Sequence, residues 1–76
     1  MIYAKEIINS GKTYTYKVET FPSPFTKTEV QEWCLHLVDN KLVMLNRDEL
    51  NKTIPIGQRL KFISECIDNH KSPIYN

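Results

Sequence analysis

Residues 13–20 read TYTYKVET, and this stretch decides the fold. Its side chains alternate between two kinds and are rich in β-branched and aromatic types, which is typical of a half-buried β-strand. Tyr14, Tyr16 and Val18 share one face, which we expect to pack, and the residues between them share a face that meets water. The pattern predicts a strand over residues 12–20 with a core on one side.

The residues before this strand predict its pairing partner. Asn9-Ser10-Gly11-Lys12 is a turn cluster in which Gly11 can adopt the positive φ of a hairpin loop of three to five residues. Residues 2–8 read IYAKEII, which also fits a short helical segment. Because a good strand follows directly, a second strand that pairs with it is the better interpretation, and we expect an N-terminal β-hairpin.

The segment after the hairpin has the spacing of a helix. Pro22 and Pro24 end the strand, because proline cannot donate to a sheet ladder. Thr26 and Glu29 fit a capping box, and Phe25 before the cap fits a hydrophobic staple. The apolar residues that follow recur at helical intervals: Val30, Trp33, Cys34, Leu37 and Val38. We expect a helix that ends at Asp39-Asn40, where Asn tolerates the left-handed conformation.

The second half of the chain predicts one more strand and two helices. Residues 41–45 have strand composition, and Asn46 with Glu49 forms a capping box for a short helix over about 47–52. Pro55 suits the first turn of a last helix over about 56–70. Its apolar stripe is Ile56, Leu60, Ile63 and Ile67, widened by Phe62 and Cys66, with Arg59, Lys61, Glu65 and Asp68 outside. Residues 72–76 are expected to fray.

These elements predict an α+β fold with two layers. A three-stranded, mainly antiparallel sheet, made of the hairpin and the third short strand, packs against two main helices and one short helix. The expected core is Tyr14, Tyr16, Val18, Trp33, Leu37, Leu42, Met44, Leu60, Ile63 and Ile67. Residues 1–71 form a single small domain, because a chain of 76 residues has room for one thin core.

Composition and charge narrow the function classes. Ten Lys and Arg against nine Asp and Glu give a net charge of +1, so the long-range field that attracts phosphate backbones is weak. The chain shows neither a signal peptide nor an apolar run that could span a bilayer, so we expect a cytoplasmic protein without a membrane role. Cys34 and Cys66 are then expected to be free thiols in the core.

The sequence contains no arrangement that predicts catalysis. Cys34 and His36 would point apart on one helix, so they cannot act as a pair. Cys66 and His70 would share a helix face, and Cys34 could add a third soft ligand, but structural zinc sites usually include a C-x-x-C knuckle that is missing here. With two glycines, the chain cannot build a phosphate cradle. We expect no enzyme activity, no metal and no cofactor.

Docking on another protein is the predicted function. The contact surface is expected at the hairpin edge and the connection after it, at Phe21, Pro22, Pro24 and Phe25, where a sheet edge adjoins rigid prolines and two aromatic rings. Eight Lys against two Arg, with six Asn, indicate an AT-rich genome. With the small size, this suggests a phage-type accessory or inhibitor protein that docks on a host protein. The oligomeric state is left open.

The alternative is a small nucleic-acid-binding regulator. The hairpin interleaves aromatic and basic residues, as a surface that stacks single-stranded nucleic acid does. The residues concerned are Tyr3, Tyr14, Tyr16, Lys5, Lys12 and Lys17. The alternation argues against this alternative, because Tyr14 and Tyr16 share the core face with Val18 while Lys17 points the other way.

Overall fold

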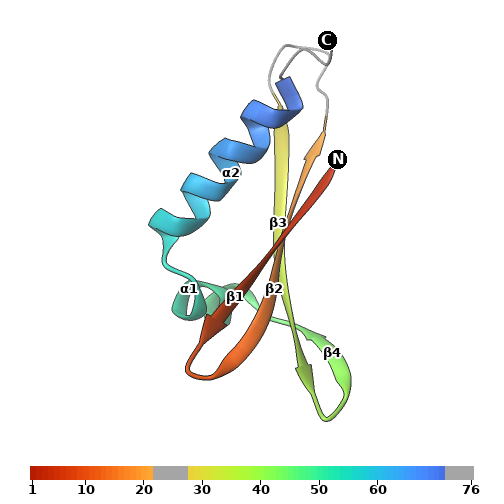
Figure 1. Ribbon diagram of the computed structural model, residues 1–76, viewed down its shortest axis with the longest axis vertical. Coiled ribbons are helices and arrows are strands. Elements are labelled where there is room, and N and C mark those ends of the chain that lie inside the picture. The colour runs from red at the N-terminus through yellow and green to blue at the C-terminus, as the bar shows by residue number, and fades with distance from the viewer. Residues whose placement is uncertain (22–27, 72–76) are drawn as a thin grey trace.

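The structure is a computed structural model that describes residues 1–21 and 28–71, with side chains as far as residue 69. Four strands are followed by two helices (Figure 1). The elements are β1 (Ile2–Asn9), β2 (Lys12–Phe21), β3 (Glu29–Val38), β4 (Lys41–Met44), α1 (Arg47–Thr53) and α2 (Ile56–Lys71). The strands lie in the sheet in chain order, and each pairs with its neighbours in antiparallel fashion.

The predicted three-stranded sheet is wrong, because the segment expected to be the first main helix is strand β3. Val30, Cys34 and Val38 fit either period, so a helical stripe and a strand face overlap in this segment. Leu35 separates the two interpretations: on a helix it lies off the stripe, whereas on a strand it shares a face with Trp33 and Leu37. The α+β class is confirmed, with four strands instead of three.

Both hairpins of the sheet close through loops of two residues. Ser10 and Gly11 have φ of 54° and 74°, and Asp39 and Asn40 have φ of 52° and 64°. Positive φ at both central positions matches the type I′ turn, whose twist suits paired strands. Asp39-Asn40 was expected to end a helix, but the same left-handed tolerance of Asn serves a hairpin that joins β3 to β4. The first loop is shorter than the three to five residues predicted.

The other predicted elements are confirmed, with ends that differ by at most one residue. The hairpin of residues 2–20, the strand over 41–45 and the helices near 47–52 and 56–70 correspond to β1, β2, β4, α1 and α2. The capping box of α1 is also present: the Asn46 side chain accepts from the Glu49 backbone N–H at 2.8 Å, and Glu49 accepts from the Asn46 N–H at 3.1 Å.

Both helices lie on the same side of the sheet (Figure 1). Among the described residues, the buried apolar side chains form one cluster between the two layers, and they are Tyr16, Val18, Cys34, Leu45, Leu50, Ile54 and Cys66. The Tyr16 ring lies 5.6 Å from that of Phe62 on α2. Asn9 on β1 donates to the Thr53 carbonyl at the end of α1, at 2.8 Å. The core is therefore one layer thick and confined to one face of the sheet.

Several residues that were predicted to lie in the core are not buried in the structure. Leu37, Leu42 and Met44 are exposed, and Trp33 is half-buried on the opposite face from Tyr16. On α2, Leu60 is exposed, whereas Arg59, expected outside, is buried. The helix is rotated so that Arg59, Phe62, Ile63 and Cys66 face the sheet.

Some expectations fall outside the described residues. Pro22, Pro24, Phe25 and the Thr26 cap lie in residues 22–27, and the frayed end was expected at residues 72–76. Glu29, the other member of the predicted capping box, begins β3.

Candidate functional site

The sheet face that points away from the helices is the candidate site, and we call it the open face. Its residues follow from the strand register and from the alternation of side chains. They are Ile2, Ala4, Glu6 and Ile8 on β1, Thr13, Thr15, Lys17, Glu19 and Phe21 on β2, Glu29, Gln31, Trp33, Leu35 and Leu37 on β3, and Leu42 and Met44 on β4. Neither helix crosses this face (Figure 1).

Large apolar side chains gather at one corner of the open face. We call Trp33, Leu35, Leu37, Leu42 and Met44, all on β3 and β4, the bulky strip. Leu37 pairs with Leu42 and Leu35 with Met44, so these side chains are cross-strand neighbours. Leu37, Leu42 and Met44 are 67%, 66% and 62% exposed. These exposed side chains are therefore apolar neighbours on one face of the sheet.

On β1 and β2, the open face carries small side chains beside larger ones, among them Ile8, which is 76% exposed, Glu6 and Lys17. Ala4, Thr13 and Thr15 on β1 and β2 form what we call the small strip. Thr15 lies directly opposite Leu35 in the register, so the strips are adjacent. Lys17 pairs with Trp33, and Glu6 pairs with Thr15. The half of the open face on β3 and β4 is therefore the more apolar one, and the half on β1 and β2 mixes small, charged and large apolar side chains.

The helix side of the sheet carries a buried polar cluster that reasoning from the sequence missed. Glu32 on β3 accepts from the Tyr16 hydroxyl at 2.6 Å and from Arg47 Nη1 at 3.0 Å. Arg59 is 3% exposed, and its Nε lies 3.8 Å from Glu32 Oε1. Its Nη2 donates to Asn51 Oδ1 at 2.8 Å. One carboxylate thus connects two strands to both helices.

The contacts of this cluster stabilise the packing of the helices on the sheet. Among the described residues, Arg59 Nε and Nη1 have no hydrogen-bond partner, so Glu32 is the charge that compensates the buried guanidinium. Burial, and next the hydrogen bond to Glu32, raise the pKa of the Tyr16 hydroxyl far above its ordinary value. Tyr16 therefore stays protonated and donates to the carboxylate.

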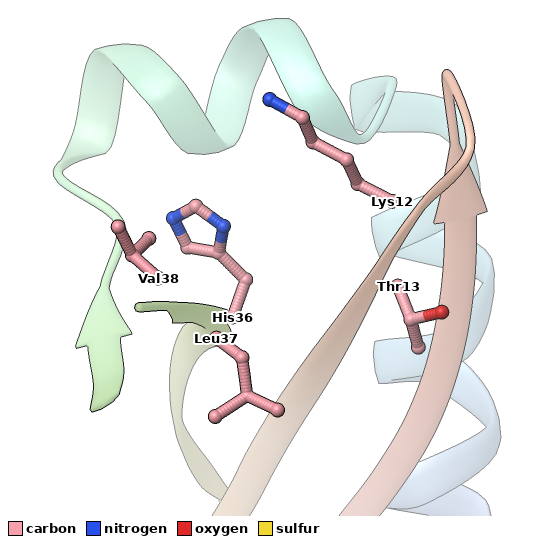
Figure 2. A pocket seen from close by; sticks show the side chains of 5 residues that line it. All are labelled: Lys12, Thr13, His36, Leu37 and Val38. Atoms are coloured by element: carbon pink, nitrogen blue, oxygen red, sulfur yellow. The ribbon is translucent and has the colours of Figure 1, made fainter. Parts of the chain in front are cut away.

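A pocket of about 390 Å³ opens where β2 and β3 separate, beyond the last paired residues Tyr14 and His36. Lys12, Thr13, His36, Leu37 and Val38 line it (Figure 2). Lys12 and His36 extend toward the helix side, whereas Leu37 points to the opposite side (Figure 2). The imidazole of His36 also stacks on Tyr14, with ring centroids 5.1 Å apart. The five lining residues include neither a thiol nor a carboxylate, so they supply no catalytic pair.

Of the residues predicted to bind a protein, the structure describes only Phe21. It ends β2 and is half-buried, on the open face and at the end remote from the bulky strip. Pro22, Pro24 and Phe25 lie outside the described residues. Their contribution to binding stays a prediction.

The residues of the nucleic-acid alternative do not share one surface. Tyr16 lies in the core, Tyr14 stacks on His36, and Lys5 Nζ lies 5.7 Å above the Phe62 ring on the helix side. Tyr3 also packs against the core, and its hydroxyl lies 3.5 Å from the Met1 sulfur. Lys17 is on the open face, and Lys12 lines the pocket.

Both cysteines are free and buried, Cys34 on β3 and Cys66 on α2. Burial raises the pKa of each thiol, so neither has the lowered pKa of a reactive cysteine. Cys34 and His36 lie on the same face of a strand and do not point apart, as the helix prediction required. Among the residues that the structure describes, no group of three or more His, Cys, Asp or Glu is placed to hold a metal ion.

Two further findings bear on the function of the protein. Over residues 1–21 and 28–71, neither helix has the length and apolar character needed to cross a bilayer. No protein-family model, curated protein or solved structure matches this chain.

The open face was not predicted, because the helix interpretation placed some of its residues in the core and the others outside it. On a helix, Trp33 and Leu37 belong to a core stripe and need no further partner. The signal that indicates the face is the alternation of Trp33, Leu35 and Leu37, followed after two turn residues by Leu42 and Met44. Every second residue of that segment is large and apolar, on a strand whose other face already packs under the helices.

Proposed function

We propose that this protein is a small protein-binding module without enzymatic activity, and that it docks on another polypeptide chain through the open face. The exposure of Leu37, Leu42 and Met44 carries the proposal. Each leaves more than half of its surface in water on a chain that buries few apolar residues. Removing such surface from water is the main driving force of association.

The chemistry of the described residues supports binding over catalysis. The residues that line the pocket include neither a thiol nor a carboxylate, both described thiols are buried, and in the polar cluster the Tyr16 hydroxyl donates to the Glu32 carboxylate. The phage-type accessory or inhibitor role, the host partner and the cytoplasmic location stay predictions from composition.

Site-directed photo-crosslinking in cells of the source organism tests this proposal. A photo-reactive amino acid replaces Leu42 on the open face and, in a matched control, Leu60 on α2, which is similarly exposed at 57%. We expect covalent adducts with a polypeptide at position 42 and few at position 60. Adding Leu37→Asp to the position-42 probe should abolish the adducts.

Equal labelling at positions 42 and 60, or no adduct at position 42, would overturn the proposal. Mass spectrometry of the adduct identifies the bound chain, which separates one class of partner from another.

The nucleic-acid alternative receives no support from a specific observation, because Tyr14 and Tyr16 pack on the helix side while Lys17 lies on the open face. Binding through phosphate contacts falls steeply with salt, whereas apolar docking persists. A titration with single-stranded DNA at two salt concentrations checks this, and we expect weak, salt-sensitive binding.

A further inference from the structure

We propose that the pocket between β2 and β3 binds a small organic anion, a carboxylate group joined to a compact apolar body. This inference goes beyond the proposed function, because the pocket recognises a small molecule and the open face a polypeptide chain. The pocket has a volume of about 390 Å³, within the range of small-molecule sites, and Lys12, Thr13, His36, Leu37 and Val38 line it (Figure 2).

The pocket forms because the two hairpins of the sheet diverge. The register between β2 and β3 ends at Tyr14 and His36. Both strands extend two residues beyond that pair, β2 to Lys12 and β3 to Val38. In these last residues, β2 pairs with β1 and β3 pairs with β4. Each wall of the pocket is therefore held by its own two-residue turn and not by the opposite wall.

The lining combines apolar surface with polar groups that can hold a carboxylate. Two aliphatic side chains of β3 supply the apolar part. Lys12 supplies an ammonium group, the Thr13 hydroxyl can donate, and the imidazole of His36 carries at least one N–H in either of its protonation states. The stack on Tyr14, with ring centroids 5.1 Å apart, fixes the plane of the imidazole. Lys12 and His36 extend to the same side of the sheet (Figure 2), so their nitrogen atoms lie on one side of the gap.

The charges around the pocket favour an anion. None of the five lining residues is acidic. Lys41 pairs with Val38, so a second lysine points to the same side of the sheet as His36. Among the residues that the structure describes, neither Lys12 nor Lys41 forms an ion pair with a carboxylate. Asp39, in the adjacent turn, is not part of the lining. The two ammonium groups are therefore available to a ligand.

The lining favours a carboxylate over a phosphate. The single ammonium group in the lining matches the single charge of a carboxylate. Phosphate sites in proteins gather more donors, from the forks of arginine side chains or from helix N-termini. The two arginines of this chain, Arg47 and Arg59, both face Glu32. The aliphatic side chains of the lining contact the rest of the ligand, so that part is apolar.

An NMR titration of the isotope-labelled full chain with benzoate tests the site, because benzoate carries one carboxylate on a compact apolar ring. We expect the amide signals of Thr13, Leu37 and Val38 to shift. The expected dissociation constant is about 1 mM, as is usual for a ligand of about nine non-hydrogen atoms in an open pocket. Benzamide has the same shape without the charge and should bind at least about fivefold more weakly. Inorganic phosphate, which has no apolar body, should also bind more weakly than benzoate.

Two variants test the polar groups one at a time. Lys12→Met removes the charge and keeps most of the side-chain length, so benzoate binding should weaken about fivefold. His36→Phe keeps a ring that can stack on Tyr14 and removes the N–H donors, so it should weaken binding by a similar factor. Lys17→Met is the matched control, because Lys17 lies on the same strand but points to the open face, and it should leave binding unchanged.

The outcomes decide the inference separately from the proposed function. No shift of the three amide signals up to about 20 mM benzoate, equal binding of benzamide and benzoate, or equal weakening by Lys12→Met and Lys17→Met overturns it. Phosphate that binds as tightly as benzoate overturns the carboxylate assignment. If either lining variant fails to fold, the other decides the question. The crosslink at position 42 reports on the open face only, so its result does not depend on the titration.

Discussion

Replacing Glu32 by Gln should destabilise the protein more than any other single charge removal on the sheet. The variant keeps the shape of the side chain and an oxygen that accepts from the Tyr16 hydroxyl. It removes the negative charge that faces Arg59, a guanidinium that is almost fully buried. A buried charge without compensation is costly, because it has lost its hydration.

The magnitude follows from the distances. Opposite unit charges at the 3.8 Å between Arg59 Nε and Glu32 Oε1 attract by about 4 kcal/mol at an effective dielectric constant of about 20. The Arg47 contact adds less than about 1 kcal/mol, because that side chain is 64% exposed. We expect a loss of about 3 kcal/mol. A domain of this length has roughly 4–11 kcal/mol in total, so the variant should be marginally folded.

Urea unfolding followed by Trp33 fluorescence measures this loss. Glu29→Gln is the matched control, since it removes the same charge from an exposed position on the same strand and should shift the midpoint little. Adding Arg59→Met to Glu32→Gln should recover part of the stability, because the uncompensated cation is gone. Equal midpoints for the Glu32 and Glu29 variants would refute the electrostatic account.

Three more predictions concern local features. Cys34 and Cys66 should react with a thiol reagent only as fast as the chain unfolds, and rapid native labelling of either would contradict their burial. Asn46→Ala should cost about 1 kcal/mol by removing the acceptor for the Glu49 N–H, which a denaturant midpoint checks. Folding raises the pKa of Tyr16 above its ordinary value of 10.0, so the stability from the neutral phenol is complete below that pH and is lost as the pH rises toward the folded pKa. In the Tyr16→Phe variant, the free energy of unfolding should fall less as the pH rises into the alkaline range. Parallel plots of the free energy of unfolding against pH for the two proteins would rule this explanation out.

Most elements were predicted correctly, because the patterns that indicate them lie within a few adjacent residues. The strand of β2 and the capping box of α1 each depend on a few adjacent residues, so the sequence is enough. The β3 segment was wrongly predicted to be a helix, because its apolar residues fit the period of a helix as well as that of a strand. Asp39-Asn40 likewise suits a helix end as well as a type I′ turn. Only pairing with β2 across the sheet decides between them, and that is a long-range contact.

The open face and the polar cluster lay beyond prediction for the same reason. Arg59 has the spacing of an outward residue on α2, and its burial depends on where Glu32 lies after β3 pairs with β2. Trp33 and Leu37 are apolar and were assigned to the core, as apolar residues usually are. Leu37 is exposed and Trp33 is only half-buried because the two helices cover one face of the sheet only.

The order of the strands has a consequence for synthesis on the ribosome. Because each strand pairs with the one that precedes it, the whole sheet can form before α2 has been made. At that stage both faces of the sheet are apolar and unprotected, since Tyr16, Val18 and Cys34 still await α2. The nascent chain is therefore most prone to aggregate just before its last helix emerges, and a truncation that removes α2 should produce insoluble protein and not a smaller folded domain.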